Sequence, residues 1–144
     1  MLTVFRAVRE NDLDDVYQLA LSAGFGITTL PKNKSELALR IKRSVESFAK
    51  EARTPFDENY LFVLEDIKTQ KIIGTSAIEA GVGHDLPFYA YRVSKISNVS
   101  HKLGIRVEYN VLSLNNDFQG LTEIGTLYLD SDHRANKNGL LLSK

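Results

Sequence analysis

The hydrophobic pattern of the sequence changes once, and this change restricts the possible folds more than any other feature. As far as Phe48 the apolar residues recur mostly at helical spacing, whereas from Tyr60 they form short continuous or alternating runs. The resulting order is one short strand, two helices and then a series of strands. The sequence therefore predicts an α+β domain with a mainly antiparallel mixed sheet flanked by helices.

The two predicted helices follow an opening strand at Thr3–Val8. Asn11 is the expected N-cap of the first helix, which ends before the loop Gly24–Pro31. Asn33 and Glu36 have capping-box spacing at the start of the second helix. The apolar faces consist of Leu13, Val16, Tyr17 and Ala20 in the first helix and Leu37, Ile41, Val45 and Phe48 in the second. For the second helix, packing of this face against the sheet is the favoured interpretation, and a partner-binding face is the alternative.

The strands predicted after the helices are Tyr60–Glu65, Lys71–Ile78, Phe88–Ser97, Arg106–Leu114 and Leu121–Leu129. The polar link Asp66–Gln70 predicts a hairpin turn between the first two. The segment Asn115–Gly120, rich in turn-forming residues, separates the last two. We expect the third strand to continue the sheet, although the spacing of Ile96, Val99 and Leu103 also allows a short helix.

Composition limits the classes of function. A chain of 144 residues predicts one domain, residues 1–144, and its 18 basic and 18 acidic side chains cancel, which argues against nucleic acid as a partner. The absence of cysteine excludes disulfides and thiol nucleophiles. His84, His101 and His133 lack the spacing of metal ligands, so no metal site is expected. No apolar run suits a membrane helix or a signal peptide, which predicts a cytoplasmic protein without a membrane partner.

A basic loop near the end of the sequence is a candidate for ligand binding. Arg134, Lys137 and Gly139 lie between the last predicted strand and the apolar segment Leu140–Leu142, which begins a helix. The N–H groups and positive dipole end of such a helix, together with two cationic side chains, suit a pyrophosphate group. An ordinary turn is the alternative. Because a single helical turn is not self-supporting, we expect the chain to be the N-terminal piece of a longer protein.

Glu123 lies in the strand that leads to this loop. Two-residue alternation places it on the same face as Gly125, Leu127 and Leu129. A carboxylate among apolar side chains has a raised pKa and suits a general base. The alternative is a solvated carboxylate at an exposed strand end.

A cluster of aromatic residues and one arginine lies at the start of the third predicted strand. Tyr89 and Tyr91 come shortly before Arg92 there, and the guanidinium group of Arg92 suits a carboxylate. These three residues are the candidates for substrate recognition. Simple packing of a strand beside the hairpin is the alternative.

Nine segments of the sequence carry a resemblance to a known family. They are Phe5–Arg9, Gly26–Pro31, Tyr60–Asp66, Gly74–Gly83, Pro87–Val93, Leu114–Asp117, Thr122–Ile124, Leu127–Asp130 and Asn138–Lys144. Together they resemble the GNAT-type acyltransferases and, more closely, the N-terminal part of the bacterial arginine N-succinyltransferase family. The resemblance implies a GNAT-like fold that is truncated after the acyl-CoA phosphate loop. It also implies succinyl transfer from succinyl-CoA, the cosubstrate, to the α-amino group of L-arginine in arginine catabolism, without a permanently bound cofactor.

The resemblance also implies roles for individual residues. The implied cosubstrate site comprises Leu127, Tyr128, Leu129, Arg134, Asn138 and Gly139. Leu127 occupies the position of a family leucine that contacts succinyl-CoA, and the last three residues lie where the superfamily has its pyrophosphate loop. That loop has glycine where this chain has Lys137. None of the three histidines matches the proton-donor histidine of the family.

The implied reaction is an acyl transfer. A base, for which Glu123 is the candidate, removes a proton from the α-ammonium group of L-arginine, and the amine attacks the thioester. Backbone N–H groups of the strand stabilise the oxyanion. The alternative is a truncated, non-catalytic interaction module or subunit that pairs with another chain, because Leu140–Leu142 needs a surface to cover it. Both interpretations allow a homo- or hetero-oligomer.

Overall fold

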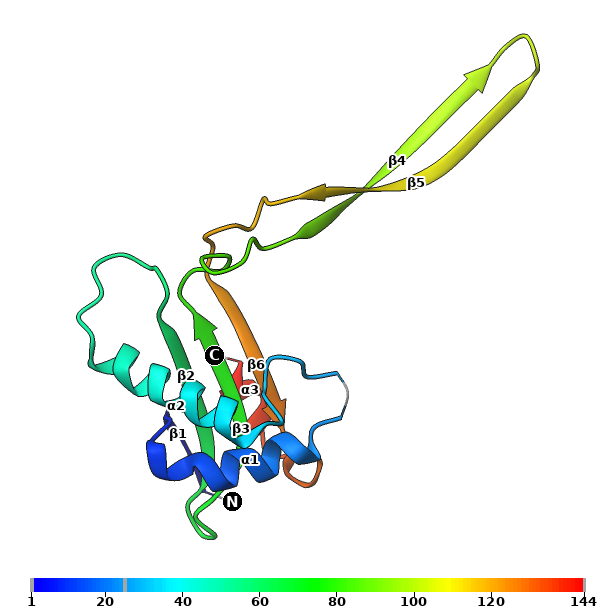
Figure 1. Cartoon of the computed structure of the whole chain (residues 1–144). Helices are drawn as coiled ribbons and strands as arrows, with labels where there is room; N and C mark the ends of the chain where they lie inside the picture. The colour runs from blue at the N-terminus through cyan, green and yellow to red at the C-terminus, as the bar shows by residue number, and fades with distance from the viewer. Residues whose placement is uncertain (1, 25, 144) are drawn as a thin grey trace.

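A four-stranded antiparallel sheet is the centre of the structure, a computed structural model that describes residues 2–24 and 26–143. In spatial order its strands are β1 (Thr3–Ala7), β2 (Asn59–Asp66), β3 (Lys71–Glu79) and β6 (Glu123–Leu129). The helices are α1 (Leu13–Ser22) and α2 (Lys34–Ala49) on one face and α3 (Asn138–Leu142) on the other, with 3-10 turns at Glu10–Asp12 and Ser131–His133 (Figure 1). The expected α+β order is confirmed. Phe25, in the predicted loop, and Lys144, at the end of the predicted last helix, lie outside the described residues.

Apolar side chains pack on both faces of this sheet. Val16 of α1 and Leu37 of α2 are fully buried in one cluster with Leu61 of β2. On the other face Leu142 of α3 packs against Leu64 of β2, and both are at most 2% exposed. Each such side chain contributes about 1.5–3 kcal/mol by leaving water. The core interpretation of the second helix's stripe is therefore confirmed, and α3 is tied to the sheet by its last leucine.

The start of α1 differs from the expectation. Asn11 does not cap the helix; instead the carboxylate of Asp12 accepts the backbone N–H of Arg9 at 2.7 Å. The same carboxylate accepts two N–H groups of the Arg6 guanidinium, at 2.7 and 2.8 Å. A charged acceptor with a charged donor makes stronger hydrogen bonds than an amide oxygen, and here it connects the turn to β1. Asn33, in contrast, caps α2 as expected.

Two of the predicted strands form an arm rather than part of the central sheet. β4 (Ala90–Ser100) and β5 (Ile105–Asn115) make a separate two-stranded antiparallel ribbon that extends away from the rest of the molecule (Figure 1). The segment from Phe88 to Ser97 is thus extended, but the expectation that it continues the sheet was wrong. Since β3 pairs directly with β6, the arm is an excursion of the chain between two neighbouring strands. Polar residues interrupt both faces of the ribbon, so neither face suits a buried sheet.

The arm exposes many apolar side chains. Near its base one face carries Tyr91, Val93, Leu112 and Leu114, and farther out the opposite face carries Ile96, Val107 and Tyr109. The four residues near the base are each more than half exposed. Within the described residues the arm therefore has no apolar layer packed against it along its length.

Amide hydrogen exchange should be much faster in the arm than in the central sheet. A two-stranded ribbon is marginally stable on its own, so amides such as that of Val93 should open by local unfolding. Amides such as that of Leu61, in the buried β2, should require global unfolding. We expect a difference of roughly a hundredfold or more in exchange rate, measured by NMR on the 144-residue chain. Equal protection of both strands would contradict the prediction.

Candidate active site

A bulge interrupts β6 at the position where the predicted site begins. The register of β6 against β3 shifts there, so that Ser76 faces both Thr126 and Leu127. Thr126 is buried and has φ 54°, a conformation that β-branched residues rarely adopt. Two hydrogen bonds hold it: the hydroxyl of Thr75 donates to the Thr126 carbonyl at 2.9 Å, and Arg40 Nη2 donates to Thr126 Oγ1 at 2.8 Å. The strained backbone is thus supported from both β3 and α2.

The bulge changes the side-chain alternation of β6. Glu123 and Thr126 line a cavity on the side of α2, whereas Leu129 packs against Leu142 of α3 on the opposite face. The expectation that Glu123, Leu127 and Leu129 share one face was therefore wrong. One extra residue in a strand shifts every following side chain to the other face. Consequently, the predicted base and the predicted cosubstrate residues belong to different cavities.

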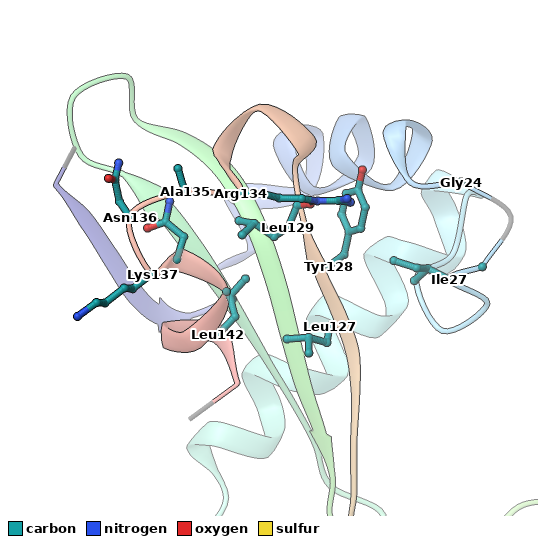
Figure 2. A pocket seen from close by; sticks show the side chains of 13 residues that line it. Gly24, Ile27, Leu127, Tyr128, Leu129, Arg134, Ala135, Asn136, Lys137 and Leu142 are labelled. Atoms are coloured by element: carbon teal, nitrogen blue, oxygen red, sulfur yellow. The ribbon is translucent and has the colours of Figure 1, made fainter.

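The cavity that contains the predicted cosubstrate residues, here called the edge cavity, has a volume of about 640 Å³ and lies along the open edge of β6. Its lining comprises Gly24, Gly26, Ile27, Leu127–Leu129, Arg134–Gly139 and Leu142. All six residues of the predicted cosubstrate site are among them. In Figure 2, Leu127 and Tyr128 lie between the loop that carries Arg134 and the segment that carries Ile27. The volume is within the usual range for small-molecule sites, about 300–1,000 Å³.

The loop that borders the edge cavity is held in shape from inside. Asn138 is 4% exposed, and its side-chain amide donates to the carbonyl of His133 at 3.0 Å. Arg134 donates from Nε to a backbone carbonyl, and within the described residues its terminal nitrogens make no hydrogen bond. Asn136 and Lys137 have φ values of 54° and 64°. Glycine adopts this conformation without steric cost, so the backbone of Lys137 has the shape expected for the glycine that the resemblance implied at this position.

The second cavity, here called the helix-side cavity, has a volume of about 470 Å³ and lies between α2 and the strands β3 and β6. Its lining comprises Thr29, Leu39, Arg40, Arg43, Asn59, Ala77, Glu79, Glu123, Gly125 and Thr126. The two cavities lie next to each other at the bulge, because Thr126 lines one and Leu127 lines the other. The structure therefore offers two adjacent compartments at a strained backbone.

Arg40 is the most buried charged group of the helix-side cavity. Its side chain is 15% exposed, and Nη2 lies 3.6 Å from the carboxylate of Glu79. Burial lowers the pKa of Arg40, and the negative charge of Glu79 opposes this effect. Arginine remains a cation at any physiological pH, so Arg40 brings a fixed positive charge to the bulge.

Known proteins resemble the chain along nearly its whole length. A family model described as the arginine N-succinyltransferase beta subunit matches residues 3–144. The chain belongs to the arginine N-succinyltransferase family. An arginine N-succinyltransferase of Photorhabdus laumondii is 43% identical over 144 residues, which cover 99% of the chain and 41% of that protein. One of Yersinia pestis is 42% identical over 139 residues, which cover 96% and 39%.

The chain also matches the solved structure of a succinyltransferase. The arginine/ornithine succinyltransferase subunit AI of Pseudomonas aeruginosa superposes with a TM-score of 0.88 at 34% sequence identity, covering 99% of the chain and 43% of that protein. The α+β fold expected for an arginine N-succinyltransferase is therefore confirmed. The chain spans about two fifths of the length of the curated relatives that it matches.

The residues predicted to recognise the substrate lie elsewhere. Tyr89 and Tyr91 are about 60% exposed at the base of the arm, and neither lines one of the two cavities described here. Arg92 Nη2 donates to the carboxylate of Asp117 at 2.5 Å. Tyr91 and Arg92 are neighbours in a strand and therefore point to opposite faces of the arm. Their role in an arginine N-succinyltransferase stays a prediction, as does that of Glu123 as a base.

Several residues of the helix-side cavity were missed from the sequence. Arg40 is on the polar side of α2, and Asn59 and Glu79 stand at the ends of strands. Each is ordinary for its place, and only the pairing of β2 with β3 and the packing of α2 bring them together. Among the described residues, no group of His, Asp and Glu could hold a metal ion, and no helix is long and apolar enough to cross a membrane.

Proposed function

We propose that the chain supplies the acyl-CoA-binding part of an arginine N-succinyltransferase, which transfers the succinyl group of succinyl-CoA to the α-amino group of L-arginine. The observation that carries the proposal is the edge cavity, which gathers all six residues of the predicted cosubstrate site around a bulged strand. Arg134 and Lys137 provide two cationic side chains for the pyrophosphate. No permanently bound cofactor is needed for this reaction.

A backbone N–H at the bulge is placed to stabilise the transition state. The carbonyl of Thr126 points toward β3, because it accepts the hydroxyl of Thr75 at 2.9 Å. The described peptide bonds are all trans, and in a trans peptide the next N–H points the opposite way. The N–H of Leu127 is therefore directed toward the open edge of β6. A thioester carbonyl in the edge cavity would accept this hydrogen bond, which strengthens as the oxygen becomes negative.

The amine then approaches from the other side of the bulge. The α-amino nitrogen of L-arginine forms the new amide bond to the succinyl carbon, and the thiolate of CoA leaves and takes up a proton. Glu123 stands four positions before Leu127 in β6, which at about 3.3 Å per residue is roughly 13 Å along an unbulged strand. Its role as the base is therefore not part of this proposal.

Arg134→Ala tests the assignment of the edge cavity. Loss of one charge-assisted contact to a phosphate is expected to weaken succinyl-CoA binding about tenfold, measured by isothermal titration calorimetry with the 144-residue chain. Arg53→Ala is the matched control, because Arg53 is exposed and does not line the edge cavity. Unchanged affinity of Arg134→Ala, or no binding of succinyl-CoA to the unaltered chain, would contradict the proposal.

The exposed arm favours a second candidate function, an interaction module or subunit without activity of its own. Its apolar base would be covered in a homo- or hetero-oligomer, and the descriptions of the matched family and of one matched structure name a subunit. Measuring the mass of the chain in solution, with and without succinyl-CoA, separates the two candidates. A monomer that binds succinyl-CoA would contradict the second. A cytoplasmic location stays a proposal from the sequence.

A further inference from the structure

Two carboxylates face each other at one end of the helix-side cavity. Glu79 and Glu123 are directly opposite residues in the pairing of β3 with β6. Like charges at directly opposite positions destabilise a sheet unless a cation lies between them. Arg40 lies 3.6 Å from Glu79, but within residues 2–24 and 26–143 the carboxylate of Glu123 has no hydrogen bond and no ion pair. This end of the cavity therefore lacks one positive charge.

A buried acceptor without a partner lies beside this pair. Asn59 is 1% exposed and lines the cavity. Its amide nitrogen donates to the carboxylate of Glu79, which leaves Oδ1 as the free end of the side chain. Among the described residues Oδ1 accepts no hydrogen bond. Buried polar atoms are nearly always paired, so the site is suited to a ligand with N–H donors.

A positive charge lies between this carboxylate pair and the bulge. Arg40 donates to Thr126 Oγ1 at the bulge, and Arg43 also lines the cavity. Glu123 and Leu127 are four positions apart in β6, a separation of roughly 10–13 Å along a bulged strand. The cavity therefore has a cationic group, Arg40, beside the bulge and a carboxylate without a partner among the described residues, that of Glu123, farther along β6.

We propose that the helix-side cavity is the acceptor site and binds an L-α-amino acid with a long cationic side chain. The guanidinium group of L-arginine donates to Glu123 and to Asn59 Oδ1, and its α-carboxylate accepts from Arg40. This arrangement leaves the α-amino group beside the bulge, within reach of a thioester at Leu127. The inference rests on the proposed function, which supplies L-arginine as the acceptor, and it makes Glu123 a specificity-determining residue.

The test compares two ligands of the same shape and different charge. L-citrulline replaces the guanidinium of L-arginine by a neutral urea group. NMR titration of the 144-residue chain should show L-arginine binding at least about tenfold more tightly than L-citrulline. Glu123→Gln should reduce this preference to about twofold or less by weakening only the binding of L-arginine. Glu46→Gln, which removes an exposed carboxylate from α2 outside the cavity, should keep the full preference.

Several outcomes would overturn the inference. A full preference for L-arginine in Glu123→Gln would exclude contact with the guanidinium, and equal weakening of both ligands would place Glu123 at the α-ammonium instead. If thermal unfolding shows that this variant does not fold, Glu123→Ala, with the same expected loss, replaces it. Succinyl-CoA binding without L-arginine binding overturns only the acceptor site, whereas L-arginine binding without succinyl-CoA binding overturns the proposed function.

Discussion

Gly74→Ala is expected to weaken succinyl-CoA binding more than about tenfold and to destabilise the chain by roughly 1–3 kcal/mol. Gly74 lies in β3 beneath α3. A Cβ atom at this position would lie 2.8 Å from Leu142 Cδ1 and 2.9 Å from the carbonyl oxygen of Tyr128. A backbone oxygen cannot rotate away as a side chain can, so β6 or α3 must move. Both border the edge cavity, and the shift would reach the loop that carries Arg134.

The matched control for this variant is Gly125→Ala in β6. A Cβ atom there would meet only Glu123 Oε1, at 3.9 Å, which is an ordinary contact. Titration calorimetry with succinyl-CoA and thermal denaturation of both variants give the comparison. If Gly74→Ala bound succinyl-CoA as well as Gly125→Ala does, the position of α3 would not determine the shape of the edge cavity.

Asp12→Ala is expected to destabilise the chain by about 2–4 kcal/mol. The Asp12 side chain is 9% exposed and accepts three N–H groups, two from Arg6 and one from the backbone of Arg9. Arg6, itself 16% exposed, also donates to Glu65 at 2.7 Å. Removing Asp12 leaves a largely buried guanidinium with one carboxylate instead of two. The same contact joins β1, β2 and the start of α1, so the loss is felt by three elements.

Urea denaturation measures this effect, and Asp14→Ala is its control. Asp14 also forms an ion pair, with Lys34 at 2.5 Å, but its side chain is 79% exposed. Exposed ion pairs contribute little because water screens them, so the control should unfold at nearly the same urea concentration as the unaltered chain. Equal stability of the two variants would contradict the importance of the Arg6–Asp12 contact.

The carboxylates of Asp12 and Glu58 predict a loss of stability in acid. Burial raises the pKa of Asp12, but the hydrogen bonds from Arg6 and Arg9 outweigh it, so the pKa lies below its ordinary value. The hydrogen bond from Lys50 lowers the pKa of Glu58 to about 2. Groups with a lowered folded pKa stabilise the chain above their unfolded value, about 4, and lose this contribution as the pH falls through the folded pKa. The free energy of unfolding should therefore decrease from about pH 4 toward pH 2, and less steeply in Asp12→Ala.

The local elements and the proximity of the six predicted cosubstrate residues were predictable because short-range rules determine them. Asn33 marks the start of α2 through contacts within three residues, and the apolar period of each helix is visible in the sequence. The loop from Arg134 to Gly139 directly follows the strand that holds Leu127, so chain continuity alone brings these residues into one cavity. Chain continuity also explains why the cosubstrate residues implied by the resemblance to the arginine N-succinyltransferases lie together at one end of the sheet.

The sequence by itself determined the α+β order, both long helices, the family and the proximity of six residues that line the edge cavity. Only the tertiary structure decided that β4 and β5 leave the sheet as an arm. The sequence allows β3 to pair with β4, the next strand along the chain, but in the folded chain β3 pairs with the more distant β6. Only the tertiary structure placed Glu79 opposite Glu123 and Arg40 at the bulge. The physical reason is that side chains alternate between the two faces of a strand only until a bulge inserts one residue, after which every side chain lies on the other face. The residue at this bulge, Thr126, adopts a backbone conformation that its own side chain disfavours and its neighbours impose.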